Sequence, residues 1–321
     1  MKIKFRAIHQ PENWLKMVAT QLDRTVTNGE VRVPPKYGEG ILKDFYPMKW
    51  LTISYLNFRM NEPFEMERTA VKDSPYIPVM FYFDTPGKQI LDNSEHKNTT
   101  EGIFMPSAQI ESKWVLPAGK WITNLTLTFD KTWLLQQLGN DNYICDLLNS
   151  KKSFYLFESL TPTILEQIQT IENYIMAGDD MKKLYMYGEA MKLFALFIDA
   201  VNSRRKDEAI CGIHAADVQQ VFRVRKILLN DVCHPPHIKD LAMEAGMSPT
   251  KLQKCFKQIF GKNIIQYALE QKMELSRELL ESRRYSVSEV GYQLGYSNLS
   301  HFSKAFYKHF NITPKNFQAS V

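Results

Sequence analysis

Polar and basic side chains recur in two short segments in the last third of the chain, and neither segment contains an acidic residue. Such side chains can form hydrogen bonds with the edges of bases and ion pairs with phosphates. The chemistry they suggest is recognition of double-stranded DNA, although the solvated outer face of any helical bundle carries similar residues. The nine candidate DNA-binding residues are Thr250, Lys251, Gln253, Lys254, Lys257, Asn298, Ser300, His301 and Lys304.

The first segment fits the second helix of a helix-turn-helix unit. Gly246 permits a left-handed turn after a short helix that begins near Ile238. Ser248 can cap the next helix, and Pro249 suits its first position. The predicted buried stripe of this second helix consists of Leu252, Phe256 and Ile259.

The same pattern recurs about fifty residues later. Gly295 takes the place of the turn glycine, and Ser297 is the predicted helix cap. Phe302 and Phe306 align with the stripe of the first unit only after a slip of one residue, so the repeat is approximate. Between the two units, residues 264–280 predict one longer amphipathic helix. A single helix-turn-helix pattern occurs in many helical bundles. Two such patterns in tandem, each with a basic second helix, favour DNA binding.

Residues 235–318 resemble the DNA-binding domain of AraC-type (AraC/XylS) transcriptional regulators. The resemblance implies two helix-turn-helix units that are bridged by the long helix and occupy successive major-groove segments on one face of DNA. It marks Thr250, Gln253, Lys254, Ser300 and Lys304 as contacts, and the other four candidates are added on physical grounds. The matching residues are Ile238, Leu241, Ala242, Gly246, Ser248, Leu252, Phe256, Lys257, Gly261, Tyr267, Leu279, Leu280, Val287, Val290, Gly295-Tyr296-Ser297, Ser300-His301-Phe302-Ser303-Lys304, Phe306, Phe310, Thr313-Pro314 and Phe317.

Five positions depart from the family pattern. Lys272 and Ser276 stand where the family usually has Arg and Ala. Gly291 replaces an Ala inside a helix, which is expected to cost up to about 1 kcal/mol. Asn311 replaces a Gly but tolerates positive φ, and Tyr307 replaces a basic residue and so removes one possible phosphate contact.

The charge distribution agrees with this interpretation. The chain has 321 residues and a formal net charge of +5. Residues 211–321 contain 15 basic residues (Lys and Arg) and nine acidic residues (Asp and Glu). Residues 1–210 contain 25 basic and 26 acidic residues. The whole positive excess therefore lies in the last third, as expected of a region that meets a polyanion.

Residues 1–160 predict a β-rich sensor domain. Aromatic and β-branched runs over 51–58, 79–83 and 121–129 are separated by proline- and glycine-containing turns, which favours an antiparallel sandwich or barrel. The family resemblance implies a cupin-like barrel that senses a small molecule. The expected fold class is therefore α+β, with a cupin-like antiparallel β-barrel and trailing helices before an all-α domain. Aromatic residues that line either a ligand pocket or the core are Trp50, Tyr55, Phe58, Phe81, Tyr82, Phe83, Trp114 and Trp121.

Residues 161–203 predict a helical hairpin. Thr161 and Pro162 suit a helix start, and isoleucines follow at helical spacing from Ile164 to Ile175. The second helix has an a/d seam and a neighbouring stripe, so it must bury two faces. Either one face meets a second subunit, or both lie inside the domain. The seam is Leu184, Tyr187, Met191, Phe194, Ile198 and Val201, and the stripe is Met186, Ala190, Leu193 and Phe197.

A polar stretch without an apolar stripe sets the boundary between the two predicted domains. Residues 204–214 are predicted to be the linker, and residues 215–321 the DNA-binding domain, whose first helix Asp217 can cap. No P-loop, dinucleotide fingerprint or nucleophile elbow occurs, and residues 1–210 contain only His9 and His96. The sequence therefore predicts no enzyme, no cofactor and no metal site.

The chain is expected to be cytoplasmic, because it has no apolar run of about 20 residues and no signal-peptide pattern at its start. Cys145, Cys211, Cys233 and Cys255 are expected to be reduced and mostly buried.

The expected function is a sequence-specific transcriptional regulator controlled by a small-molecule effector. Its expected partners are double-stranded DNA, the effector, RNA polymerase and a second copy of the chain, without membrane association. One alternative is a ligand-independent regulator whose first domain only dimerises or contacts a partner. A cupin-type enzyme with an appended helical domain is the other alternative.

Overall fold

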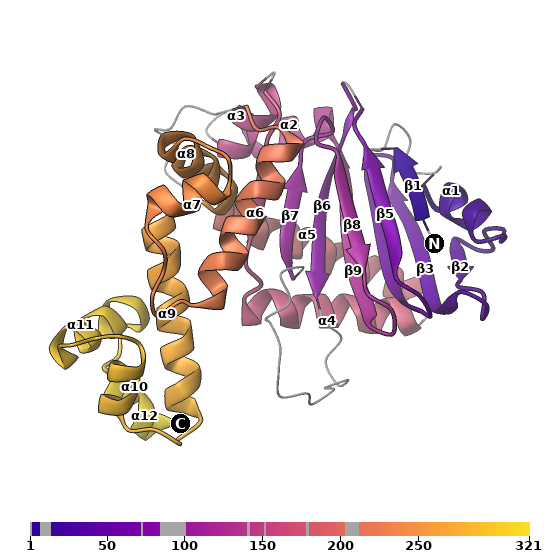
Figure 1. Cartoon of the computed structure of the whole chain (residues 1–321). Helices are drawn as coiled ribbons and strands as arrows, with labels where there is room; N and C mark the ends of the chain where they lie inside the picture. Colours follow the sequence, from indigo (N-terminus) through magenta and orange to yellow (C-terminus); the bar gives the residue numbers. More distant parts are fainter. Residues whose placement is uncertain are drawn as a thin grey trace. The chain divides into compact units, whose positions relative to one another are not determined.

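The computed structural model describes residues 2–6, 14–71, 73–83, 101–139, 142–150, 152–177, 180–202 and 212–321. The chain folds into two compact units, Met1–Ala215 and Ala216–Val321, which are described separately below (Figure 1). No described helix is both long and apolar enough to cross a bilayer. Cys145 and Cys255 are buried thiols, Cys233 is a partly exposed thiol, and Cys211 lies outside the described residues.

The first unit contains two β-sheets. The larger is antiparallel, with the strand order β10-β7-β6-β9-β4-β3-β2. Its strands are β2 (Glu30–Arg32), β3 (Gly38–Met48), β4 (Leu51–Met60), β6 (Tyr76–Phe83), β7 (Gly102–Pro106), β9 (Trp121–Asp130) and β10 (Tyr155–Glu158). The smaller sheet has the order β1-β5-β8 and consists of β1 (Lys2–Arg6), β5 (Phe64–Thr69) and β8 (Ser112–Leu116).

The α+β class and the antiparallel main sheet agree with the prediction. Two details differ from a closed antiparallel barrel. Strand β1 pairs with β5 in parallel, and no described strand belongs to both sheets. The strands therefore form two facing layers rather than one continuous ring (Figure 1).

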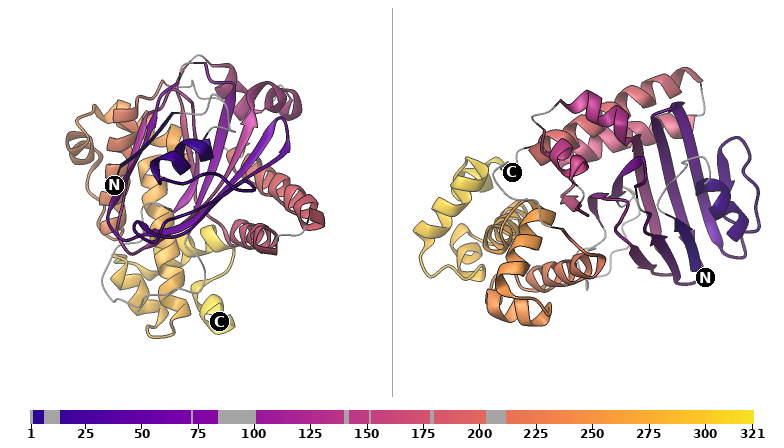
Figure 2. Two further views of the ribbon diagram at one scale, coloured as in Figure 1. Left: turned by 90° about the vertical axis from the view of Figure 1, so that its right-hand side faces the viewer. Right: turned by 90° about the horizontal axis from the view of Figure 1, so that it is seen from above.

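Helices α4 (Pro162–Ala177) and α5 (Asp180–Asn202) cover one face of the larger sheet (Figure 2). The predicted start of α4 is confirmed, because the Thr161 hydroxyl accepts a hydrogen bond from the Ile164 backbone N–H at 3.3 Å. The helix buries its predicted isoleucines against fully buried sheet residues such as Tyr55, Phe81 and Phe129. The buried isoleucines are Ile164, Ile168, Ile171 and Ile175.

The two stripes of α5 have different surroundings. The stripe of Met186, Ala190, Leu193 and Phe197 is buried throughout its length. The heptad seam is buried only in its second half, whereas its first residue, Leu184, is 66% exposed. One face of α5 therefore belongs to the core of the first unit, and the start of the seam lies on the surface of this unit.

In the described part of the first unit, three short helices lie outside the predicted hairpin. They are α1 (Trp14–Gln21), α2 (Lys131–Leu138) and α3 (Tyr143–Asn149). Asp130 caps α2 by accepting from the Trp133 N–H at 2.9 Å, and Asn142 caps α3 by accepting from Ile144 N–H at 2.9 Å. These helices were not predicted from the sequence, because helices of seven or eight residues are too short for their period to be distinguished from that of a strand.

The second unit is helical throughout, as predicted. The long helix α9 is amphipathic, and its N-terminus is closed by a capping box between Asn263 and Gln266. Asp217 does not cap the first helix as predicted, because that helix already begins at Ala215. The helices are α6 (Ala215–Asn230), α7 (Ile238–Glu244), α8 (Pro249–Phe260), α9 (Ile264–Glu281), α10 (Val287–Gln293), α11 (Leu299–Phe310) and α12 (Pro314–Ser320).

Candidate nucleic-acid interface

Helices α7 and α8 form the first helix-turn-helix unit. Gly246 has φ of 61°, the left-handed conformation predicted for the turn. Ser248 caps α8 by accepting a hydrogen bond from the Lys251 N–H at 3.2 Å, and Pro249 occupies the first position. The predicted stripe is buried, with Leu252, Phe256 and Ile259 all at 0% exposure. These contacts fix which side of α8 faces outward.

Helices α10 and α11 form the second unit. A capping box between Ser286 and Glu289 starts α10, and Gly295 has φ of 80° in the turn. The cap of α11 is Asn298, whose Oδ1 accepts from the Ser300 N–H at 2.8 Å, so the prediction that Ser297 caps this helix is wrong. Asn298 is a predicted DNA contact, but its carbonyl oxygen is already used within the helix cap.

The second turn is one residue longer than the first. Gly295 follows Gly246 by 49 residues, whereas α11 starts 50 residues after α8. This extra residue explains the slip seen in the sequence repeat. At an offset of 50, Phe302 and Phe306 coincide with Leu252 and Phe256, and all four side chains are fully buried. The two recognition helices therefore present equivalent positions to the outside.

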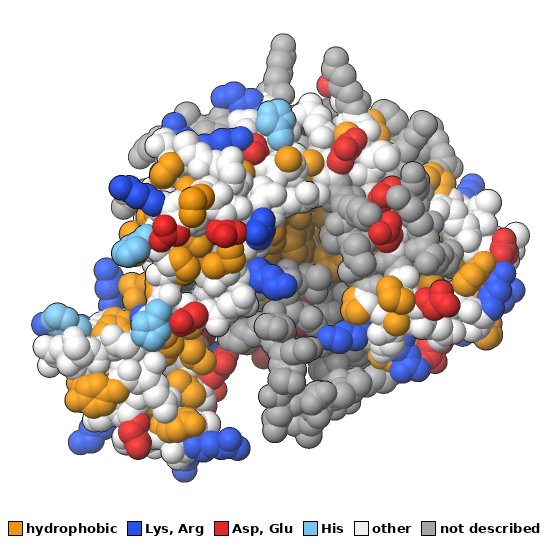
Figure 3. Space-filling view, viewed as in Figure 1, with side chains coloured by type: hydrophobic (Ala, Val, Ile, Leu, Met, Phe, Trp, Pro, Cys, Tyr) orange, Lys and Arg blue, Asp and Glu red, His pale blue; other side chains and the backbone are white. Residues whose placement is uncertain are grey.

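Most of the predicted contact residues lie on these outer faces. Their side chains are held away from the core because Leu252, Phe256 and Ile259 of α8 and Phe302 and Phe306 of α11 are buried on the opposite side of each helix. Lys257 is only partly exposed. Figure 3 shows Lys and Arg side chains along the edge of the second unit that carries α8 and α11. The exposed candidates are Thr250, Lys251, Gln253, Lys254, Asn298, Ser300, His301 and Lys304.

One of the candidate cations is paired inside the unit. Lys251 Nζ donates a hydrogen bond to Asp217 Oδ1 at 2.7 Å, and this hydrogen bond raises the pKa of Lys251. The carboxylate is only 9% exposed, whereas the lysine is 50% exposed. Helix α6 makes two further polar contacts, from Arg223 to Glu244 at 2.8 Å and from Arg225 to the Tyr267 hydroxyl at 2.6 Å. These polar contacts connect α6 with α7, α8 and α9.

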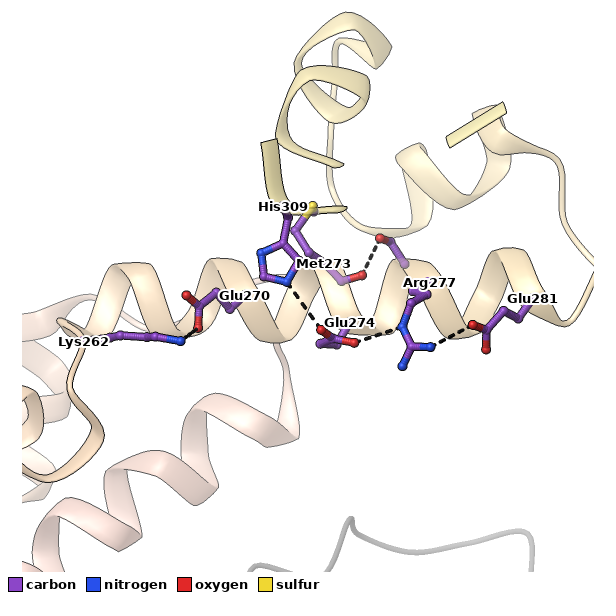
Figure 4. A network of polar contacts seen from close by, with 8 residues as sticks. Lys262, Glu270, Met273, Glu274, Arg277, Glu281 and His309 are labelled. Atoms are coloured by element: carbon purple, nitrogen blue, oxygen red, sulfur yellow. Dashed lines mark hydrogen bonds and ion pairs between the residues drawn. The ribbon is translucent and has the colours of Figure 1, made fainter. Parts of the chain in front are cut away.

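A polar network connects α11 with the long helix α9. A ring nitrogen of His309 lies 3.4 Å from Glu274 Oε1, and the other oxygen of Glu274 accepts from Arg277 Nε at 3.1 Å. Arg277 also donates to Glu281 at 2.8 Å, so one face of α9 carries a chain of ion pairs (Figure 4). The acidic residues of this network lie on α9, and neither α8 nor α11 contains an acidic residue.

Comparisons with known proteins agree with this geometry. A family model described as a helix-turn-helix domain matches residues 241–320. The Msm operon regulatory protein of Streptococcus mutans is 27% identical over 171 residues, which cover 53% of this chain and 60% of that protein. The regulatory protein PchR of Pseudomonas aeruginosa is 30% identical over 99 residues, which cover 31% of this chain and 33% of that protein. The C-terminal unit is an AraC-type helix-turn-helix domain.

A solved structure of an AraC-type transcriptional regulator from Chromobacterium violaceum is similar to 33% of this chain and 95% of its own, with 29% identity and a TM-score of 0.31. The matched segments span less than two thirds of the length of the two curated relatives. These relatives are named as regulatory proteins rather than enzymes, in agreement with the prediction.

The structure explains several departures from the AraC-type pattern. Lys272 Nζ donates to the Cys233 carbonyl at 2.9 Å and lies 5.5 Å from the centre of the Tyr296 ring, so it connects the loop before α7 with the turn of the second helix-turn-helix unit. A Cβ atom at Gly291 would lie 2.6 Å from Leu299 Cδ2 and 3.1 Å from Phe302 Cδ1. Glycine at this position therefore allows α10 to pack closely on α11. This packing is a structural reason for a residue that lowers helix propensity.

Two further departures from the family pattern, Ser276 in the interior and Asn311 at a helix end, form local hydrogen bonds. The buried Ser276 hydroxyl donates to the Met273 carbonyl at 2.6 Å. Asn311 ends α11 with φ of 56°, and its N–H donates to the Tyr307 carbonyl, which confirms that asparagine takes the role of the glycine. Tyr307 itself is 54% exposed.

Two features of this AraC-type domain were not found from the sequence. The pairing of Lys251 with Asp217 spans 34 residues, and no helical period relates such distant positions. Arg283 and Arg284 are exposed in the turn before α10. The concentration of positive charge in this third of the sequence was the only signal for these residues.

Proposed function

We propose that this chain is a sequence-specific DNA-binding transcriptional regulator whose helices α8 and α11 enter two successive segments of the major groove. The observation that carries the proposal is the 50-residue repetition of outward positions on two helices without acidic side chains. Exposed Lys, Gln, Asn, Ser and Thr side chains on such helices match the donors and acceptors of base edges and phosphates.

The nine candidates are not equivalent in this proposal. Thr250, Gln253, Lys254, Ser300 and Lys304 take the direct contacts, since all five are exposed and the two lysines occupy equivalent positions. His301 extends the same surface on α11. The other three contribute less, because each is committed to an intramolecular contact or is partly covered; these are Lys251, Lys257 and Asn298.

The test is selection of binding sites by the full chain from a random duplex library, followed by titration of the selected site. The expected site contains two short conserved blocks about 10 base pairs apart, which is the spacing of successive major-groove segments on one DNA face. Binding that is equal for selected and scrambled duplexes at moderate salt contradicts the proposal, since phosphate contacts alone give no sequence preference.

We infer that the first unit controls this activity by binding a small-molecule effector and by dimerisation, and that RNA polymerase is a further partner. The dimer surface we propose is the exposed start of the α5 seam. Leu184 and Tyr185 are 66% and 60% exposed, and Tyr174 on α4 stacks on Tyr185 with ring centres 5.9 Å apart. Exposed apolar side chains in such a group are typical of protein interfaces.

Sedimentation equilibrium of the full chain tests the dimer. We expect a dimer at micromolar concentration and a shift towards monomer in Leu184→Asp. Leu269→Asp is the matched control, because Leu269 lies on α9 in the other unit and is 45% exposed. Equal dissociation in both variants, or none in Leu184→Asp, contradicts the proposed surface.

A further inference from the structure

Helix α9 carries both helix-turn-helix units, and each unit packs against a different half of it. The first half contacts α8 through Tyr267, whose ring centre lies 5.4 Å from that of Phe256. The second half contributes Met273 and Leu280 to the core of the second helix-turn-helix unit. Figure 1 shows α8 beside one end of α9, and α10, α11 and α12 beside the other. The separation of the two recognition helices therefore depends on how straight α9 remains.

A small bend in α9 is enough to change this separation. The helix has 18 residues, so it is about 27 Å long. A bend of about 15° at its midpoint moves one end sideways by about 3.5 Å, which equals the rise of one base pair. Long helices commonly curve by such an amount. A protein that recognises two DNA blocks at a fixed spacing therefore benefits from a contact that holds the middle of this helix.

Lys272 lies at this midpoint, as the ninth of the 18 residues. Its ammonium group donates to the Cys233 carbonyl at 2.9 Å and lies 5.5 Å from the centre of the Tyr296 ring. Cys233 belongs to the segment between α6 and α7, whereas Tyr296 belongs to the turn between α10 and α11. One side chain thus connects the middle of α9 with a segment on the side of each helix-turn-helix unit.

The segment that contains Cys233 is held in a fixed conformation. Asp231 Oδ1 accepts hydrogen bonds from the backbone N–H groups of Cys233 at 3.0 Å and His234 at 2.9 Å. The bond from His234 above all lowers the pKa of Asp231. Pro235 and Pro236 follow, and their fixed φ limits the freedom of the backbone before α7. The position of the Cys233 carbonyl is therefore tied to that of the first helix-turn-helix unit.

The Tyr296 ring is in turn tied to the recognition helix α11. Its centre lies 5.5 Å from that of Phe302, which is fully buried in the first turn of α11. The adjoining Gly295 lies directly against the other segment, because a Cβ atom there would be 3.6 Å from both the Cys233 carbonyl oxygen and His234 Nε2. The Cys233 side chain also packs against the apolar core of the second helix-turn-helix unit. The two units therefore touch at this point as well as through α9.

We propose that Lys272, together with the Cys233 carbonyl and the Tyr296 ring, determines the spacing of the two DNA blocks that the chain recognises. The ammonium group holds the segment before α7 and the turn before α11 at a fixed separation, so α8 and α11 keep one relative orientation. Lys272 is a positioning residue, which acts through these two helices rather than through a DNA contact of its own. This inference rests on the proposed function, since it concerns the spacing of the two major-groove segments.

Binding of the full chain to three duplexes tests the proposal. They are the selected duplex and two derivatives with one base pair inserted or deleted between the blocks. We expect the native chain to bind the derivatives at least about tenfold more weakly, because one base pair shifts a block by about 3.4 Å and rotates it by about 35°. Fluorescence anisotropy at several salt concentrations measures these affinities.

Lys272→Met keeps most of the side-chain stem but loses the donor and the charge. It should bind the selected duplex about threefold to tenfold more weakly and bring the three affinities to within about threefold of one another. Lys272→Arg retains a donor and a cation above the ring, so it should keep the native preference. Tyr296→Leu removes the ring but leaves the hydrogen bond to the Cys233 carbonyl, and it should relax the preference only in part.

The matched control is Lys262→Met. Lys262 directly precedes α9, pairs with Glu270 at 2.6 Å, and has a side chain that is 49% exposed. Its loss removes the same charge near the same helix without affecting the contact between the two helix-turn-helix units. We expect any weakening in this variant to be equal for the three duplexes. Thermal unfolding followed by circular dichroism checks that each variant is folded.

Two results overturn the proposal. Equal weakening on all three duplexes in Lys272→Met, with the native preference intact, would show that Lys272 only stabilises the fold. A salt slope that falls by about 0.9 in Lys272→Met but not in Lys262→Met would identify a direct phosphate contact instead. If Lys272→Met does not fold, Tyr296→Leu decides by the same comparison.

The same titrations separate this inference from the proposed function. A native chain that binds selected and scrambled duplexes equally refutes the proposed function. A native chain that prefers the selected duplex but tolerates the inserted base pair refutes only the role of Lys272 in spacing.

Discussion

The core of the second helix-turn-helix unit and the space between the two sheets of the first unit use buried residues in opposite ways. The former is a cluster of apolar side chains, and its polar and charged neighbours on α11 lie outside. The latter contains a buried arginine (Arg68), a buried aspartate (Asp44) and a threonine hydroxyl for which the described residues offer no hydrogen-bond partner. The apolar cluster consists of Met273, Leu280, Val290, Leu294, Phe302 and Phe306.

This difference separates stability from binding. In the helical unit, core residues maintain the fold and the exposed residues bind, so a contact residue can be replaced at little cost in stability. Between the sheets, polar and charged groups are themselves buried, and a buried group without a full set of partners lowers stability. Substitutions in the two regions should therefore have effects of opposite sign, and the following variants test this.

The largest expected effect is that of Phe306→Ala. The Phe306 ring is fully buried and contacts the rings of Phe302, Phe310 and Phe317, with centre distances of 4.6–6.0 Å. Its loss leaves a cavity between α9, α11 and α12 and is expected to lower the free energy of unfolding of the second unit by about 3–5 kcal/mol. Urea denaturation followed by circular dichroism measures this change.

The neighbouring Tyr307→Ala is the matched control for Phe306→Ala. It removes an aromatic ring from the same helix, but this ring is 54% exposed. We expect a change below about 1 kcal/mol. Similar losses in both variants contradict the view that burial, rather than ring removal, determines the effect.

Asp44→Asn should have the opposite sign. Burial raises the pKa of Asp44 to about 6, so the folded state disfavours the carboxylate at neutral pH. The neutral amide avoids this penalty and can still accept from the Tyr46 hydroxyl, which now lies 3.1 Å from Oδ2. We expect the variant to be more stable than the native chain at pH 7.5, by on the order of 2 kcal/mol.

The pH dependence distinguishes this mechanism from a general packing effect. Because the folded pKa of Asp44 is raised, its contribution to stability is present below pH 4 and is lost as the pH rises through about 6. The advantage of Asp44→Asn should therefore disappear near pH 4. Thermal unfolding of both proteins from pH 4 to 8 measures the difference in stability between them. A difference that stays constant across this range contradicts a raised pKa of Asp44 as its cause.

The same contrast explains what the sequence could predict. In the second unit, caps, turn glycines and apolar stripes are local signals, so Gly246, Ser248 and Pro249 were placed correctly from their neighbours alone. Two local errors concern helix caps: Ser297 was chosen instead of Asn298 because the second turn is a residue longer, and Asp217 lies inside α6 rather than before it. In the first unit, the position of Arg68 depends on the register between distant strands, which a single sequence does not contain.

Lys254→Ala and Lys304→Ala test binding by exposed residues. These lysines occupy equivalent positions on α8 and α11. Each substitution should weaken binding to the selected duplex up to about tenfold and reduce the slope of log affinity against log salt by about 0.9, with little change in stability. Fluorescence anisotropy at several salt concentrations measures both quantities.

Lys226→Ala on α6 is the matched control, because it removes one exposed positive charge of the same domain outside the two recognition helices. Its salt slope should change by less than that of either recognition-helix variant. If all three variants show the same slope, the two lysines contribute only to the general field of the domain. If only one of the pair changes the slope, the two units do not bind DNA equivalently.

The smallest expected effect is that of Asp217→Asn. In the native chain Lys251 is held by Asp217, so Lys251→Ala should change DNA affinity less than twofold at moderate ionic strength. Removal of the carboxylate releases this cation towards the DNA and should tighten binding about twofold to threefold, with a salt slope larger by up to about 0.9. Asp240→Asn, an exposed acid on α7, controls for the charge change alone. Tighter binding that is equal in both variants would show that charge rather than pairing is responsible, and weaker binding in Asp217→Asn would show that α6 must hold Lys251 in place for DNA recognition.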